Sequence, residues 1–326
     1  MYRDLRDRDP VHHVGDGDFW FLARFADVFA AARDPATYSS ASGLTVDPDG
    51  PAADLGDVTP IVFLDPPDHT AFRRLVGRGF TPRQVADLEH EVRVFVTSAL
   101  DRVVEAGGGD IIADLFKPLP SFVVAHYLGV PATDRVRFDG WTERIVAGAG
   151  QGGTSDGLDA IADLAGYFSH LIDRRRTDPG DDMVSQLVGL GEEQASVMWI
   201  LGFAFTMVAG GNDTTTGMLG GSAVLLTEHR GERRRLLDDP SLIPNAVEEL
   251  LRLTSPVQNL ARTTTRDVDV GGTTIPTGAR VLLGYGSANR DEREYGANSE
   301  CLDVGRPVER MLTFGSGTHF CLGAAA

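Results

Sequence analysis

The feature that most constrains this chain is a stretch near its end, residues 314–323, which reads F-G-S-G-T-H-F-C-L-G. It contains Cys321, one of two cysteines in the 326-residue chain, and glycines stand at fixed offsets on both sides of it. Glycine lets the backbone take positive φ angles or approach a large ligand closely. A thiolate held in such a loop therefore suits a flat, bulky metal cofactor.

A structural cysteine buried in a glycine-rich turn is one alternative for Cys321. A zinc site is a poorer one, because H-x-C supplies two ligands where four are usual. Cysteine thiolate is also the axial ligand that makes haem iron favour O–O bond cleavage. The stretch satisfies every position of F-G-x-G-x-H-x-C-x-G and resembles the haem-binding loop of the cytochrome P450 family. The resemblance implies that Cys321 binds the iron of haem b and that Phe314 and Gly315 belong to the cofactor-binding set.

Composition and charge argue against several functional classes. The formal net charge is −17, and such a surface repels nucleic acid. Two cysteines make no disulfide framework, so a reducing cytoplasm is expected. The charged start M-Y-R-D-L-R-D-R-D-P is unlike a signal peptide, and the longest apolar run, 195–209, is shorter than the roughly 20 residues of a membrane span. We therefore expect no nucleic-acid partner and no membrane insertion.

Hydrophobic periodicity predicts a mainly α fold with a small β part, packed as one domain over residues 1–326. Alternating Thr, Val and Ile residues predict strands in 261–285, and a hairpin is expected in 11–22. Residues 39–60 and the glycine-rich 148–157 are expected to be loops. Helices are expected at 25–33, 66–80, 116–128, 135–147, 158–176, 192–226, 232–237 and 244–253. A further helix is expected to begin with Thr81 as its N-cap.

A second group of residues lies in the middle of the long predicted helix, where the chain reads G-G-N-D-T-T from Gly210. Glycine in a helix interior costs about 1 kcal/mol relative to alanine, and threonine hydroxyls can bond the carbonyl one turn earlier. A local opening of the helix, with room for a small ligand, is therefore expected. The stretch resembles the oxygen-activating centre of the P450 family, which implies that Asp213 relays protons and that Thr214 hydrogen-bonds the bound dioxygen. The alternative is a close helix crossing at the two glycines, with Asp213 and Thr214 solvated.

Glu249 and Arg252 are three residues apart in a predicted helix, so their side chains can pair. Such a pair is usually exposed and contributes little. Its place before the cysteine loop resembles the E-x-x-R motif of the family, whose third member would be Arg306. The resemblance assigns these three residues to the integrity of the fold and of the haem pocket rather than to chemistry.

His69 and Arg73 are four residues apart on one helical face, where they can present two donor groups to an anion. Arginine is the natural partner of carboxylate, and haem carries two propionates. The segment D-P-P-D-H-T-A-F-R-R resembles the propionate-binding helix of the family, and Arg262 and His319 match two further propionate ligands. A surface charge is the alternative for any one of them. Gly210 completes the residues expected to bind the cofactor.

The resemblance covers nearly the whole chain, including A-N-R-D at 288–291. It implies more chain before Met1 and a helix after the cysteine loop, where this sequence ends in three alanines. Such a helix would cover the cysteine side of the haem. We therefore expect the chain as given to bind haem weakly or to fold poorly, and a helix added at its end to rescue it.

The resemblance as a whole implies a haem-thiolate monooxygenase that inserts one oxygen atom of O2 into a C–H bond of a small apolar substrate. The electrons would come from a ferredoxin-type partner and its NAD(P)H-dependent reductase. There are three alternatives. A peroxide-driven peroxygenase would not need Asp213 and Thr214. The other two are a non-catalytic haem binder or sensor and an inactive truncated paralogue. By the resemblance, residues 39–60 and the helices within 135–176 would line the substrate entrance. They show apolar residues such as Leu44 and Ile61 and no distinctive charged anchor that identifies the substrate.

Overall fold

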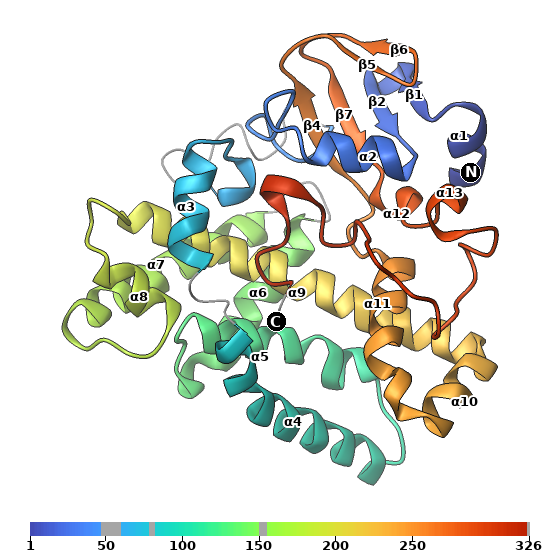
Figure 1. Ribbon diagram of the computed structural model, residues 1–326. Coiled ribbons are helices and arrows are strands. Elements are labelled where there is room, and N and C mark those ends of the chain that lie inside the picture. Colours follow the sequence, from blue (N-terminus) through green and yellow to red (C-terminus); the bar gives the residue numbers. More distant parts are fainter. Residues whose placement is uncertain (47–59, 78–81, 150–154, 325–326) are drawn as a thin grey trace. The chain divides into compact units, whose positions relative to one another are not determined.

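The computed structural model describes residues 1–46, 60–77, 82–149 and 155–324, and these form two compact units (Figure 1). Residues 1–46 and 217–324 make up the first unit, and residues 60–77, 82–149 and 155–216 make up the second. Helices dominate, and every strand of the described residues lies in the first unit. This is the mainly α fold with a small β part that the sequence predicted; a single domain over residues 1–326 stays a prediction.

The larger sheet of the first unit has the strand order β1-β2-β7-β4-β3. The hairpin expected in 11–22 is formed by β1 (Val11–Val14) and β2 (Phe19–Leu22), and β2 pairs in parallel with β7 (Arg280–Leu283). On its other side β7 pairs antiparallel with β4 (Leu260–Thr264), which also carries β3 (Tyr38–Ser39). A separate hairpin joins β5 (Val268–Val270) to β6 (Thr273–Ile275). Strands therefore fill the predicted 261–285 segment, and Ser39, expected in a loop, belongs to β3.

Two hydrophobic cores stabilise the first unit. In the first, Phe25 and Val28 of one helix pack against Leu22, Val281 and Leu283 of the sheet. In the second, Leu250 and Leu253 pack with Leu302 and Val304. The helices of this unit are α1 (Tyr2–Arg8), α2 (Phe25–Ala32), α10 (Arg230–Asp238), α11 (Ile243–Thr254), α12 (Tyr285–Ala288) and α13 (Glu292–Tyr295).

The second unit is helical throughout its described residues. Its core contains the edge-to-face pair Phe138 and Phe168, with ring centroids 6.5 Å apart. The helices are α3 (Asp68–Val76), α4 (Pro82–Glu105), α5 (Pro118–Tyr127), α6 (Arg135–Ala149), α7 (Ser155–Thr177), α8 (Met183–Gly189) and α9 (Val197–Glu228), whose last part belongs to the first unit. None of the described helices, α9 included, is both long and apolar enough to cross a membrane.

Some helix boundaries differ from those predicted. The long helix begins at Val197 rather than at 192, because the hydroxyl of Ser196 accepts a hydrogen bond from the amide of Trp199 and caps the first turn. The α8 helix was not predicted, although Asp182 caps it by accepting from the amide of Ser185 at 2.8 Å. The short α12 and α13 were also missed, and α3 begins at Asp68 rather than at 66, while residues 78–80 of that prediction lie outside the described residues. Thr81, residues 47–59 of the expected loop and residues 150–154 lie outside the described residues.

Candidate functional site

The cysteine loop of the first unit is closed by backbone hydrogen bonds. The amide of Cys321 donates to the carbonyl of Phe314 at 2.8 Å, and the amide of Gly315 donates to the carbonyl of Leu312 at 2.9 Å. The rings of Phe314 and Phe320 meet edge to face, with centroids 6.3 Å apart. These contacts bring the two ends of the loop together and leave Cys321 exposed.

Two glycines of this loop occupy backbone conformations that L side chains rarely adopt. Gly315 has a φ of 68° and Gly317 a φ of 69°. A Cβ on Gly317 would lie 2.7 Å from the carbonyl oxygen of Ala32 and 2.8 Å from the Cα of Arg33. The end of α2 therefore packs directly against the loop. The positive φ expected of its glycines is present, and the close approach of the backbone to a large ligand stays a prediction.

Glu249, Arg252 and Arg306 form one buried charge cluster in the first unit. Arg252 donates to the two carboxylate oxygens of Glu249 at 2.7 and 2.8 Å, and Arg306 donates to the same carboxylate at 3.1 Å. Glu249 and Arg252 are fully buried, and Arg306 is 8% exposed. The pairing predicted from the E-x-x-R spacing is confirmed, and its burial shows that it is not a surface ion pair.

Asn289 connects this cluster to the cysteine loop. Arg252 donates to the backbone carbonyl of Asn289 at 2.6 Å, and the side-chain oxygen of Asn289 accepts from the amide of Leu312 at 2.7 Å. The side-chain nitrogen of Asn289 donates to the hydroxyl of Thr313 at 3.0 Å. The buried cluster therefore holds the residues that immediately precede Phe314, and this role of Asn289 was not found from the sequence, although its A-N-R-D segment was noticed.

Arg262 and His319 lie at the same end of the β3–β4 pair. His319 Nε2 is 3.1 Å from the hydroxyl of Ser40, which directly follows β3. Ser39 pairs with Thr263, so Arg262, the next residue along antiparallel β4, lies level with Ser40. Arg262 is 4% exposed, and within the described residues its guanidinium bonds only the carbonyl of Ala261. A buried guanidinium with no carboxylate partner among these residues can pair with an anion.

His69 and Arg73 lie one turn apart on α3 of the second unit, as predicted. Burial lowers the pKa of His69, the positive charge of Arg73 lowers it further, and Asp65 raises it. The helix is held by Phe72, whose ring centroid is 4.8 Å from that of Trp199 on α9. Because residues four apart share one face of a helix, the two side chains can act on one anion.

The residues that resemble an oxygen-activating centre lie in α9. Thr214 Oγ1 donates to the carbonyl of Gly210 at 2.7 Å, as the sequence predicted, and Asp213 is exposed. The sequence predicted that the helix opens locally at this point. That prediction is wrong, because residues 197–228 are α-helical throughout. A carbonyl oxygen has two lone pairs, so the hydroxyl bond adds to the helical bond instead of replacing it.

The two glycines of α9 have different surroundings. A Cβ on Gly211 would lie 2.8 Å from a methyl group of Val124, so α5 crosses α9 closely at this residue. A Cβ on Gly210 would have no heavy atom of another segment within 4 Å. The close helix crossing is therefore confirmed at Gly211, and the oxygen-activating role of the segment stays a prediction. Asn212, which the sequence analysis passed over, is buried and donates to the carbonyl of Val208 at 2.7 Å.

The residues predicted for the site divide into two sets, one in each unit. In the first unit, one loop and its neighbouring strand carry Phe314, Gly315, His319, Cys321 and Arg262. In the second unit, α3 carries His69 and Arg73, and α9 carries Gly210, Asp213 and Thr214. Ser40 was missed because only the folded chain brings it to His319, 279 residues away.

Comparisons with known proteins agree with this arrangement. The family model Cytochrome P450 matches residues 224–325. Cytochrome P450 130 of Mycobacterium tuberculosis is 58% identical over 100% of this chain and 83% of its own length. Vitamin D(3) 25-hydroxylase of Pseudonocardia autotrophica is 37% identical over 99% of this chain and 81% of its own length. CYP109E1 of Bacillus megaterium, solved in complex with testosterone, matches with a TM-score of 0.87 and 30% identity over 99% of this chain and 84% of that one.

The cysteine loop, the buried E-x-x-R cluster and these relatives lead to one conclusion. The chain belongs to the cytochrome P450 family of monooxygenases, which hold haem b through a cysteine thiolate.

Proposed function

We propose that Cys321 is the haem ligand of this monooxygenase. The observation that carries the proposal is the exposed cysteine in a loop closed from Phe314 to Cys321 and shaped by Gly315 and Gly317. When bound, haem b supplies the reductive cleavage of dioxygen and the transfer of one oxygen atom to the substrate. The chain supplies the thiolate and holds it in place, because the contact of Gly317 with α2 and the bonds of Asn289 fix both sides of the loop.

Arg262, His319, His69 and Arg73 are proposed to bind the two propionates. The fit is supported by Arg262, a buried cation whose guanidinium bonds only a neutral carbonyl among the described residues. Removing such a charge from water is costly unless an anion accompanies it. Arg262→Gln should therefore weaken haem binding by at least about tenfold, measured by haem transfer to apomyoglobin, because a charge-assisted hydrogen bond is lost.

Asp213 and Thr214 are proposed to move protons from solvent towards the haem site. The Asp213 carboxylate is exposed and can exchange protons with solvent. The Thr214 hydroxyl directs its hydrogen to the Gly210 carbonyl, which leaves its oxygen lone pairs able to accept a bond from a proton donor. An acid next to an alcohol can therefore pass a proton from solvent to the interior. A peroxide-driven reaction would need neither residue.

The electron donor is proposed to be a ferredoxin-type protein served by an NAD(P)H-dependent reductase. Arg33 supports this proposal: it is exposed beside the cysteine loop, and its guanidinium lies 5.2 Å from the ring centroid of Phe29. An exposed cation at this place would attract a donor with an acidic surface. Arg33→Glu should slow reduction by such a ferredoxin and leave reduction by dithionite unchanged; equal slowing in both assays would refute the docking role.

The substrate is proposed to be a small apolar molecule of about steroid size. Support comes from the apolar Leu44 and Ile61 near the expected entrance, from the relative named for vitamin D(3) and from the related structure solved with testosterone. Spectral titration with a steroid, a terpene, a fatty acid and a macrolide would identify the class. The cytoplasmic location remains an expectation from the two-cysteine composition.

The test of the central assignment is the absorption spectrum of the reduced, carbon monoxide-bound protein. A strongly red-shifted Soret band indicates thiolate ligation. Cys321→Ser should abolish this band, because a hydroxyl is a poor iron ligand at neutral pH, and Cys301→Ser should keep it. A thiolate spectrum in Cys321→Ser would refute the assignment, and a native protein without any Soret band would favour a paralogue that binds no haem.

A further inference from the structure

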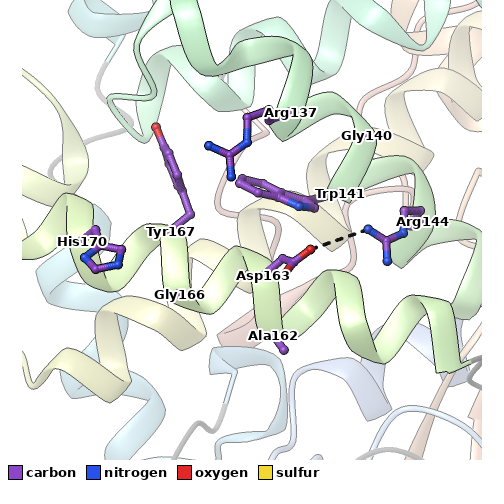
Figure 2. A pocket seen from close by; sticks show the side chains of 9 residues that line it. All are labelled: Arg137, Gly140, Trp141, Arg144, Ala162, Asp163, Gly166, Tyr167 and His170. Atoms are coloured by element: carbon purple, nitrogen blue, oxygen red, sulfur yellow. Dashed lines mark ion pairs between the residues drawn. The ribbon is translucent and has the colours of Figure 1, made fainter.

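We propose that the groove between α6 and α7 is a binding site for a small, flat aromatic carboxylate. The groove has a volume of about 580 Å³ and lies entirely within the second unit (Figure 2). This volume falls in the range of about 300–1,000 Å³ that is usual for sites of small ligands. None of the residues assigned above to haem, protons or electron transfer lines it.

The charge of the groove is carried by Arg137. Two arginines line the groove, and Arg144 is already paired, with Asp156 at 2.8 Å and with Asp163 at 3.8 Å. Arg137 has no carboxylate within ion-pair distance among the described residues and makes only a contact with a ring. Its planar guanidinium therefore keeps a set of donors that matches the two oxygens of a carboxylate.

The half-buried Tyr167 carries the aromatic surface of the groove, and the buried Trp141 supports both Tyr167 and Arg137. Their ring centroids are 5.4 Å apart, and the guanidinium carbon of Arg137 lies 5.0 Å from the centroid of Trp141 (Figure 2). The Tyr167 hydroxyl donates to Asp134 at 2.9 Å, so its hydrogen is occupied and its ring remains as apolar surface. Arginine and aromatic rings placed together provide both a charge and a flat contact for a ligand.

Two glycines keep the groove open. Gly140 on α6 and Gly166 on α7 both line it, and a Cβ on either would meet no heavy atom within 4 Å beyond its own stretch of helix. Glycine is unfavourable in a helix interior relative to alanine, and neither residue needs a positive φ. The two glycines therefore leave space that a side chain could fill without strain, which is the space proposed for the ligand's ring.

The same residues select the class of ligand. A neutral aromatic molecule would leave the donors of Arg137 unused, and a phosphate would bring extra negative charge towards Asp163 on the groove wall. A monocarboxylate on a flat ring satisfies Arg137 and contacts the ring of Tyr167. Its single negative charge is also matched by Arg137, the arginine of the groove that has no carboxylate partner among the described residues.

The experiment is a ligand-observed NMR titration of the haem-loaded protein with 2-naphthoate, with 2-naphthylmethanol as the neutral control ligand. We expect a Kd on the order of 1 mM for a ligand of this size. Arg137→Gln and Gly166→Leu should each raise the Kd at least tenfold, and the neutral alcohol should bind at least tenfold more weakly. The absorption spectrum recorded in the same titration reports any binding beside the haem.

Matched control variants separate the groove from general effects. Arg102→Gln removes an exposed arginine of α4, and Gly231→Leu fills open space on α10, so both should bind 2-naphthoate as the native protein does. Circular dichroism checks that every variant is folded. Unchanged binding in Arg137→Gln or Gly166→Leu, equal binding of the alcohol, or no binding of 2-naphthoate at 10-fold the expected Kd would each overturn the proposal.

Discussion

Replacing Glu249 by Gln removes the negative charge from the buried cluster that holds Arg252 and Arg306. Its carboxylate accepts three guanidinium bonds of 2.7, 2.8 and 3.1 Å and a fourth bond from the amide of Asp303 at 3.2 Å. All three charged side chains are buried, so water cannot replace the lost partner. Breaking a buried ion pair in this way destabilises a protein by about 3–5 kcal/mol.

This loss is large against a net stability of about 5–15 kcal/mol. With an unfolding entropy of about 2.1 cal/mol/K per residue, a chain of 326 residues has roughly 0.7 kcal/mol/K, so the melting temperature should fall by about 4–7 °C. Thermal unfolding of the haem-loaded protein, followed by circular dichroism, measures the change. Because Arg252 also bonds Asn289, the fraction of protein with a thiolate-type Soret band should fall as well.

A matched control is Glu89→Gln, which removes a carboxylate from an exposed pair with Arg93 on α4. The Glu89 variant should keep the native melting temperature, because exposed pairs contribute little. If Glu249→Gln also melted at the native temperature, the argument from burial would be wrong. If it melted lower but kept full thiolate ligation, the link through Asn289 to the loop would be refuted.

Three further outcomes are expected. Thr214→Ala should keep haem and substrate binding but divert electrons to peroxide or water, seen as oxygen consumed without product; wild-type coupling would refute its role. Burial raises the pKa of the Asp139 carboxyl more than the hydrogen bond from Ser121 lowers it. The contribution of this carboxyl to the free energy of unfolding is therefore lost as pH rises through that pKa. Asp139→Asn should therefore stabilise the protein at pH 7 and lose this advantage near pH 4, measured by urea unfolding. Gly317→Ala should cost at least about 1 kcal/mol for its positive φ, with added loss from contact with α2, and should lower haem content, whereas Gly231→Ala should not.

Local spacing explains why so much of the site could be predicted. Glu249 and Arg252 pair because residues three apart meet on a helix, and Thr214 bonds Gly210 because a side-chain hydroxyl reaches the carbonyl one turn earlier. The glycines of the cysteine loop follow from backbone sterics alone. The mainly α fold likewise follows from hydrophobic periodicity, whereas α8 and α12 are too short to show a clear period.

The sequence by itself determined the chemistry of the cysteine loop, because thiolate, glycines and histidine stand within one short segment whose geometry is local. Only the tertiary structure decided which distant groups support it. Asn289 reaches Leu312 across 23 residues and Ser40 reaches His319 across 279, and no local pattern records such contacts. The burial that turns the E-x-x-R pair from a weak surface contact into a strong constraint is also a property of the packed chain. The physical reason is that a charge pair gains its energetic weight from the exclusion of water, which depends on everything packed around it.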